Sequence, residues 1–369
     1  MKYEQNNPVP IPPTGAFSGV DATVRSVFDW EYALRKQNLL GLYEKGKAAN
    51  WNATDLDWSI EVDIEKMMAE RMASGGNLMN SLLNPPRKLD DKEVTELQLN
   101  MNAFMLSQFL HGEQGALLAT GKIVQTVPEE EAKFYAASQV MDEARHVEVY
   151  HRYLTEKMGT SYPVNASLQT LLDDILRDPR WDLTFLGMQI MVEGLALAAF
   201  GLMRMMMAGE PLIQDITSRI MADESRHVAF GVIALEGLYT KELTSQELRE
   251  REDFVIDATH LLRERLLMDQ VFERLGWERD VWLPWAEQTP FMVGFRQMTF
   301  AKIVPNLKRL GLLTPRVRAA FEKLDLLRFE HMKDSVEEPE AQPPEELVKL
   351  LMQFLAEGPA EGQAAAASA

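Results

Sequence analysis

Two copies of one short motif, DEARH at 142–146 and DESRH at 223–227, decide how this chain folds. Each copy lies inside a long run of helix-forming residues, and in each a Glu stands three residues before a His. Residues three apart share one face of an α-helix, so each copy presents a carboxylate beside an imidazole. The two pairs are Glu143 with His146 and Glu224 with His227.

The composition limits the partners and the chemistry of the chain. Of its 369 residues, 46% are hydrophobic, which is enough for a sizeable core. The net charge of −18 argues against nucleic acid and anionic membranes as partners. The absence of cysteine excludes disulfides, zinc–thiolate sites and iron–sulfur clusters. It fits a reducing cytoplasm, and the polar, Pro-rich start lacks the apolar core of a signal peptide, so we expect a cytoplasmic protein.

One apolar stretch, 185–209, is long enough to span a bilayer. It carries Glu193 near its centre and Arg204 further on, and a charge at mid-membrane is costly and rare. A helix that is apolar all round is also typical of the core of a large helical bundle. We therefore expect a buried helix and no membrane.

The rest of the chain shows an all-α pattern, with Gly and Pro between long segments of helical period. We expect an extended lead over 1–20, one helical domain over 21–330 with its metal-binding bundle at about 92–240, and a partly disordered acidic and Ala-rich tail over 331–369. The predicted helices are 22–48, one ending near 74–77, 92–126, 129–158, 165–178, 181–208, 212–240, further helices over 243–327 broken at 275–277, Pro284, Pro305 and Pro315, and a short one at 344–356.

The helix before each motif carries a Glu of its own, Glu113 in the first pair and Glu193 in the second. The Glu-to-Glu spacing is 30 residues in the first pair and 31 in the second, with a turn near the middle of each, at Pro128 and at 209–211. Antiparallel helices rise about 1.5 Å per residue, so the chain travels about 20 Å out and about 20 Å back. All the carboxylates therefore reach the same depth of a four-helix bundle.

Such a bundle offers the ligand set of dinuclear carboxylate proteins, a Glu from each of two helices and a Glu-x-x-His from each of the others. Oxygen-rich sites with two imidazoles suit iron or manganese, so we expect two Fe ions, with Mn or mixed Mn/Fe as alternatives. A single Glu-x-x-His is more often a solvated surface pair, but two copies with matched partner Glu residues are hard to attribute to chance. The predicted ligands are Glu113, Glu143, His146, Glu193, Glu224 and His227.

The other charged residues of the motifs have a predicted supporting role. A metal-bound His usually donates its second ring proton to a carboxylate, and Asp142 and Asp223 are placed to orient the His of the opposite copy. Arg145 and Arg226 can hold those carboxylates by charge-assisted hydrogen bonds. The alternative is simple surface pairing of Asp with Arg three residues apart.

These motifs resemble the ferritin-like di-iron carboxylate proteins of the ribonucleotide-reductase small-subunit type. The twin Asp-Glu-x-Arg-His is most similar to the hydroxylase alpha subunits of bacterial multicomponent monooxygenases, and WNATDLDW at 51–58 is similar to a Trp-containing stretch before their bundle. The resemblance covers about 90–240. It implies a homodimer that activates O2 at two irons and inserts oxygen into an organic substrate, with the six residues above as ligands.

Two positions depart from relatives in that superfamily. The monooxygenase alpha subunits have a Thr one turn after the third Glu, where this chain has Leu197, which puts their proton-handling step in doubt. Arylamine N-oxygenases have an extra His one turn before the last Glu, where this chain has Ile220.

Tyr150 follows His146 by one turn on the ligand face, at the position of the radical tyrosine in the reductase small subunit. The alternative is a core tyrosine that donates to a ligand carboxylate. We take Glu113, Glu193 and Tyr150 as the candidate catalytic residues.

A substrate pocket is expected beside the metals, on the helix faces that carry Glu113 and Glu193. Its mainly apolar wall suits an apolar or aromatic small molecule, although ordinary bundle core is an equal alternative for each residue. With no flavin, nicotinamide or iron–sulfur signature, the electrons must come from an external reductase or ferredoxin. The predicted pocket residues are Phe109, Leu117, Gln189, Leu197 and Phe200.

Three functions fit this pattern. The first is a di-iron monooxygenase. The second is a radical or two-electron oxidase that uses Tyr150, and the third is a non-enzymatic iron-binding bundle.

Overall fold

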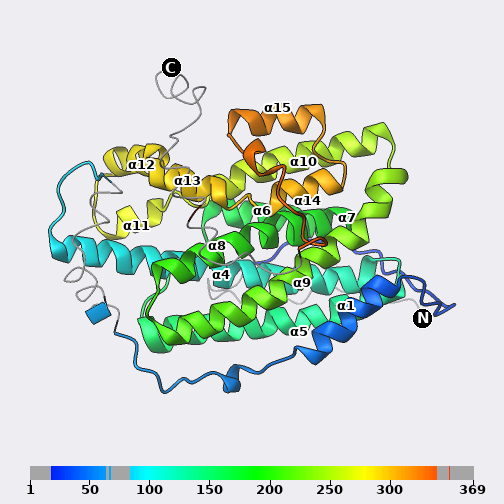
Figure 1. Ribbon diagram of the computed structural model, residues 1–369, viewed down its shortest axis with the longest axis horizontal. Helices are drawn as coiled ribbons and strands as arrows, with labels where there is room; N and C mark the ends of the chain where they lie inside the picture. Colours follow the sequence, from blue (N-terminus) through cyan, green and yellow to red (C-terminus); the bar gives the residue numbers. More distant parts are fainter. Residues whose placement is uncertain (1–17, 64–65, 68–83, 339–348, 350–369) are drawn as a thin grey trace, which may run out of the picture.

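The computed structural model describes residues 18–63, 66–67, 84–338 and 349, and its regular structure over these residues is helical throughout. Four long helical rods form the centre: α4 (Asp91–Thr126), α5 (Glu130–Tyr153), the continuous rod of α7 (Trp181–Phe185), η3 (Leu186–Val192) and α8 (Glu193–Met206), and α9 (Pro211–Lys241). Figure 1 shows them side by side, and α1 (Gln37–Ala48) lies against α5 and α9. The predicted four-helix core is confirmed. The shorter helix expected over 165–178 is also present, as α6 (Ala166–Arg177).

The ends of these helices follow from local sequence. Asp90 caps α4 by accepting from the backbone N–H of Glu93, whose side chain accepts in return from the Asp90 N–H. Glu210 caps α9 by accepting from the N–H groups of Leu212 and Ile213, after a turn in which Gly209 has a φ of +103°. The three residues between Thr126 of α4 and Glu130 of α5 form an equally short connection, which makes these two rods antiparallel and brings Glu113 level with Glu143.

The rod from Trp181 to Arg204 is long and apolar enough, by composition, to cross a membrane. In the folded protein 94% of its most apolar window is buried among other helices. Its apolar surface is therefore used as bundle core, as we expected for 185–209.

The outer helices lie on one side of the bundle and extend from one end of it (Figure 1). They are α10 (Ser245–Glu264), α11 (Asp269–Arg274), α12 (Arg279–Gln288), α13 (Pro290–Met298), α14 (Ile303–Arg309) and α15 (Pro315–Lys323), with a short 3₁₀ turn at η4 (Leu327–Phe329). The 3₁₀ turn η1 (Ala53–Asp55) lies against α5 instead. Residues 331–338 lie against α14, where Asn306 donates to Ser335 and Arg309 to Asp334. The helices expected near 74–77 and 344–356 fall almost entirely outside the described residues.

Two helix predictions were wrong. The helix expected over 22–48 begins only at Gln37, and residues 18–36 are extended or bent along the surface. Phe28 and Trp30 in this segment are 69% and 74% exposed, so the apolar pattern there has no core to pack against. Proline does not end a helix at Pro284 or Pro305, because α12 continues through the first and the second lies in the first turns of α14.

Candidate metal centre

Six buried side chains from the four rods converge at one level of the bundle. Their ligand atoms fall into two groups, in each of which all atoms lie within 4.8 Å of one another. The first group is Glu113, Glu143, His146 and Glu224, and the second is Glu143, Glu193 and His227. The two groups share Glu143, as expected for a carboxylate between two neighbouring ions. This is the side-chain arrangement of the ferritin-like di-metal carboxylate proteins.

Both imidazoles turn the same ring nitrogen toward this centre. Nδ1 of His146 lies 3.2 Å from a carboxylate oxygen of Glu113 and 3.2 Å from one of Glu224. Nδ1 of His227 lies 3.2 Å from Oε1 of Glu143 and 3.4 Å from Oε1 of Glu224. The lone pair of each Nδ1 atom can therefore point into its own ligand group when Nε2 carries the proton.

The Nε2 atoms meet the aspartates of the opposite motif. Nε2 of His146 lies 3.1 Å from Oδ2 of Asp223, and Nε2 of His227 lies 3.2 Å from Oδ2 of Asp142. Donation to these carboxylates keeps the proton on Nε2 and fixes the plane of each ring. The exchange between motifs therefore locks α5 and α9 in register around the centre.

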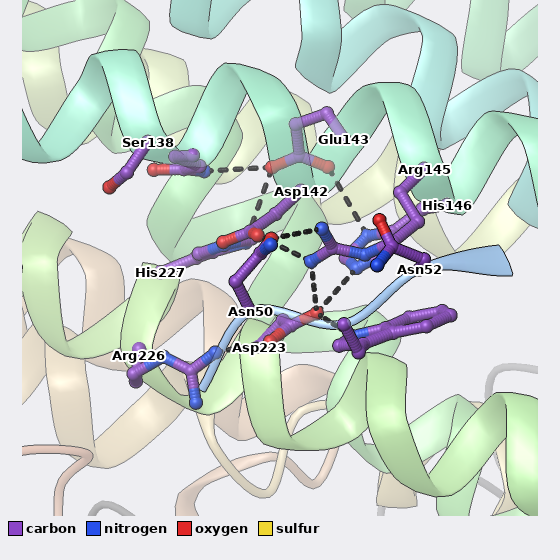
Figure 2. Close-up of polar contacts among 12 residues, drawn as sticks. Asn50, Asn52, Ser138, Asp142, Glu143, Arg145, His146, Asp223, Arg226 and His227 are labelled. Carbon is purple, nitrogen blue, oxygen red and sulfur yellow. Dashed lines mark hydrogen bonds and ion pairs between the residues drawn. The ribbon is translucent and has the colours of Figure 1, made fainter. Parts of the chain in front are cut away.

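A network of arginines holds the aspartates in place (Figure 2). Arg145 donates to Asp142 and to Asp223, and Arg226 donates to Asp223. Arg145 also donates to Asn50, and its guanidinium lies 4.5 Å from the centre of the Trp51 ring. The indole N–H of Trp51 donates to Asp223. The exposed Asp–Arg pairing considered as an alternative does not describe these side chains, because Asp142, Arg145 and Asp223 are buried.

Gln139 lies one turn before Glu143 and joins two carboxylates. Its amide nitrogen donates to Glu143 at 2.9 Å and to Glu193 at 3.0 Å. One oxygen of each carboxylate is thereby held, and the other is left facing the centre. Gln139 thus supports both groups of the cluster.

Several buried ligand atoms have no hydrogen-bond donor among the described residues. They are Oε2 of Glu143, Oε2 of Glu193, both carboxylate oxygens of Glu224, and Nδ1 of His227. A buried acceptor without a donor is costly, and cations supply what these atoms lack. Because oxygen donors predominate and two imidazoles complete the set, the residues fit iron, manganese or a mixed pair.

The charges in the cluster lead to the same conclusion. Burial raises the pKa of Glu113 to about 8, with repulsion from Glu224 adding to the effect. Burial together with Glu224 and Glu143 also raises the pKa of Glu193 well above its usual value. Burial lowers the pKa of His146, but nearby carboxylates, Glu113 first, raise it well above normal. Without a cation, therefore, the cluster retains protons to offset its negative charge.

Two buried tyrosines flank the centre on opposite sides. Burial and the negative charges of Glu113 and Glu224 raise the pKa of Tyr150. Tyr135 stacks edge-on to His227, with ring centres 6.4 Å apart. Neither phenol has a hydrogen-bond partner by distance and angle in the described part of the chain. Each group of ligands therefore has a tyrosine within reach.

A small cavity adjoins the carboxylates between α4 and α8. The cavity volume is about 20 Å³, room for about one water molecule. Phe109 and Phe200 lie in its wall, with ring centres 4.6 Å apart. The full lining is Gln108, Phe109, Gly112, Glu113, Ala116, Val192, Glu193, Ala196, Phe200, Glu224 and Arg265.

Three residues expected in the pocket, Leu117, Gln189 and Leu197, are not in the lining of this cavity. For Gln189 the reason is the π-helical segment η3, in which hydrogen bonds span five residues. Gln189, four residues before Glu193, therefore does not share the helix face of Glu193. Its side chain packs against Gly231 of α9 instead. On α8 the cavity face follows Glu193, Ala196 and Phe200, which passes beside Leu197.

Sequence reasoning missed four residues of this site. Gln139 had a usable signal, because four residues before Glu143 is the same helix face. Trp51 is 172 residues from Asp223 in sequence, so no helical period links the two. Tyr135 and Arg265 stand in ordinary helical surroundings and gave no signal.

No protein-family model matches the sequence, and no curated protein matches it. Among solved structures, the chain is similar to a point mutant of an R2-like ligand-binding oxidase with anaerobically reconstituted Mn/Fe cofactor, at 17% identity over 73% of this chain and 92% of that one, with a TM-score of 0.46. It is also similar to dimanganese(II)-NrdF from Streptococcus sanguinis, at 14% identity over 79% and 98%, with a TM-score of 0.49. Because the sequence identities and TM-scores are both low, the function is inferred below from the residues of this chain.

Proposed function

We propose that this chain is an O2-dependent oxidoreductase that holds two iron ions, or a Mn/Fe pair, and oxygenates a small, mainly apolar or aromatic molecule. The observation that supports this most strongly is the convergence of six buried ligand residues from four helices in two adjoining groups, with donor-free ligand atoms on α5, α8 and α9. Bound iron ions would supply the activation of O2, with electrons from an external reductase or ferredoxin.

The residues of the chain hold the centre and keep it dry. Asp142 and Asp223 keep the Nε2 proton on each imidazole, so that Nδ1 stays free as a ligand atom. Phe109 and Phe200 form an apolar wall beside Glu113 and Glu193, which excludes water and positions an apolar group near the carboxylates. The substrate is therefore expected to approach from the α4 and α8 side.

Metal content tests this proposal first. After anaerobic loading with Fe(II), we expect about two ions per chain, as the two ligand groups require. Glu143 belongs to both groups, so Glu143→Ala is expected to lose most of the metal. Glu148→Ala, on the exposed face of the same helix, is the matched control and keeps it. A wild-type protein that retained no stoichiometric iron or manganese would end the proposal.

Oxygen chemistry is the second test. The Fe(II)-loaded protein is expected to consume O2 when reduced by a ferredoxin and its reductase, and the Glu143→Ala variant is expected not to. Equal O2 uptake by the two proteins would show that the metal centre is not where O2 reacts.

A radical or two-electron oxidase is the second candidate, and one observation favours it. The Tyr150 phenol is buried near Glu113 and Glu224, whose negative charges raise its pKa, and Thr217 is the hydroxyl nearest to forming a hydrogen bond with it among the described residues. Electron paramagnetic resonance after O2 exposure separates the two functions. A persistent tyrosyl signal that is lost in Tyr150→Phe would favour the oxidase, and its absence from the wild type would favour oxygenation.

A third candidate, a non-enzymatic iron-binding bundle, differs in assembly. Storage ferritins need only the bundle, whereas α10 to α15 follow α9 in the part of this chain that the structure describes. Sedimentation separates the two cases: we expect a cytoplasmic homodimer, and a large hollow assembly would favour storage.

A further inference from the structure

Arg265 is a buried arginine that forms no ion pair with any residue that the structure describes. It follows the last residue of α10 and is 3% exposed. Its Nε and Nη1 atoms make no hydrogen bond to any described residue. Burial lowers its pKa to about 10, so the guanidinium is still a cation at neutral pH. Such a charge is strongly unfavourable unless something else meets it.

Other buried arginines of the chain have their partners. Arg251 makes two hydrogen bonds to the carboxylate of Asp182. Arg296 donates to the backbone carbonyls of Ala286 and Glu287. Arg265 has neither kind of partner, so its side chain is placed for something that the folded chain does not itself supply.

The place of Arg265 shows where that partner would sit. Arg265 lines the cavity that Glu113, Glu193 and Glu224 line as well. The remaining wall is largely apolar and includes the two phenylalanines, Phe109 and Phe200. A molecule in this cavity would therefore meet a cation, an apolar wall and the metal-binding carboxylates at once.

The cavity also has room that the packing leaves unused. Gly112 is buried in the middle of α4, yet a Cβ added there would find no atom within 4 Å. Ala116 and Ala196 keep the neighbouring wall small. The cavity itself is about 20 Å³, room for about one water molecule, so an organic ligand would enter it as the side chains of this wall move apart.

We propose that Arg265 binds the carboxylate of a small organic monoanion, whose apolar part lies along Phe109 and Phe200 toward the metal centre. A guanidinium matches the planar, two-oxygen geometry of a carboxylate. One cation balances one negative charge, whereas a phosphate dianion would bring excess charge close to three glutamates. This inference rests on the proposed function, because it gives the chemical class of the oxygenated substrate.

Direct binding tests the proposal without turnover. The full-length protein, loaded with Mn(II) under anaerobic conditions, is titrated with hexanoate, 1-hexanol and hexylamine in a calorimeter. We expect hexanoate to bind at least about 10-fold more tightly than either other probe, since a charged pair in a buried site is worth at least that factor. Equal binding of hexanoate and hexanol would overturn the proposal, because it would mean that Arg265 is satisfied by water and does not bind a carboxylate.

Variants identify the residue responsible. Arg265→Met is expected to remove the preference for hexanoate while metal content stays unchanged. Arg263→Met is the matched control, since Arg263 also lies on α10 and has an unpartnered Nη1 but is absent from the cavity wall. Gly112→Val fills the free space and is expected to weaken hexanoate binding about 10-fold or more. A preference that survives Arg265→Met contradicts the proposal.

Stability gives a readout that a purely structural arginine would not produce. In the absence of ligand, Arg265→Met is expected to raise the melting temperature, because it replaces an unpaired buried charge with an apolar chain of similar length. Added hexanoate is expected to stabilise the wild type and not the variant. A variant with a lowered melting temperature would show that Arg265 serves the fold and would overturn the proposal.

The two proposals fail in different ways. A wild type without stoichiometric metal would end the proposed function, while a hexanoate preference that depends on Arg265 would still establish the anion site. A wild type with two metals and no hexanoate preference would end the anion site alone.

Discussion

The indole nitrogen of Trp51 lies 2.8 Å from Oδ2 of Asp223, and the same oxygen lies 3.1 Å from Nε2 of His146. A residue just after α1 is thereby joined through one carboxylate to an imidazole of the candidate metal centre. The Asp223 oxygen accepts from three sources, because Arg145 also donates to it. Asp223 therefore sets the orientation of His146 and ties the N-terminal segment to the bundle.

Asp223→Asn is expected to weaken metal binding about 10- to 100-fold, the usual effect of removing a carboxylate behind a ligand histidine. The amide has no charge to hold Arg145 and Arg226, and it can present a donor to Nε2 of His146, which favours the wrong tautomer. Competition with a coloured chelator measures the Mn(II) affinity. Glu148→Gln, an exposed carboxylate on α5, is the control. An unchanged affinity in Asp223→Asn would show that His146 is not a ligand.

Removal of metal is expected to destabilise the whole bundle. Without cations, the clustered carboxylates repel one another, and burial with this repulsion raises the pKa of Glu113 and of Glu193. An ion present at 100 times its Kd adds about 2.7 kcal/mol of stability. Scanning calorimetry with and without added Mn(II) measures the difference. Equal melting temperatures in wild type, or an equal rise in Glu143→Ala, would contradict a specific site.

The four-helix core and the convergence of the candidate ligands followed from sequence because each rests on a local rule. The i, i+3 spacing puts Glu143 and His146 on one face whatever the tertiary structure. The near-equal distances from Glu113 and Glu193 to their motifs set the depth of each carboxylate, because helical rise is constant. Asp142 and Asp223 follow because an imidazole that faces a metal has a second nitrogen to satisfy.

The features that could not be predicted depend on tertiary packing. A π-helical segment before Glu193 moved Gln189 away from the position that an α-helical period gives it. The segment around Phe28 has a helical pattern but is extended, because no neighbouring surface buries it. Arg265 could not be singled out, because its lack of a partner appears only when all its neighbours are known.

Two glycines that differ only in their surroundings are expected to respond to alanine with opposite signs. At Gly112 a new Cβ meets open space, so Gly112→Ala is expected to stabilise α4 by about 0.5–1 kcal/mol through its helix propensity. At Gly231 a new Cβ would lie 2.6 Å from the Cβ of Gln189, so Gly231→Ala is expected to destabilise by about 1–3 kcal/mol. Urea denaturation measures both. A destabilised Gly112→Ala would show that the cavity is closed in solution.

A buried ion pair away from the centre joins three elements. The carboxylate of Asp182 in α7 accepts two hydrogen bonds from Arg251 of α10 and one from the Tyr239 hydroxyl of α9. Asp182→Asn leaves the buried Arg251 with only the more exposed Glu250, 3.5 Å away, as an acidic partner and is expected to cost about 3–5 kcal/mol. Tyr239→Phe removes one neutral donor and is expected to cost about 1 kcal/mol.

An exposed pair of the same residue types provides the control for Asp182. Asp173 on α6 lies 3.3 Å from Arg177, and both side chains reach solvent, so Asp173→Asn is expected to change stability by less than about 1 kcal/mol. The rod that begins with α7 continues through η3 to Glu193. In a urea concentration at which the wild type still keeps its ions, Asp182→Asn is therefore expected to lose part of its metal. Equal losses of stability in Asp182→Asn and Asp173→Asn would show that the buried pair is not what joins α7 to α10.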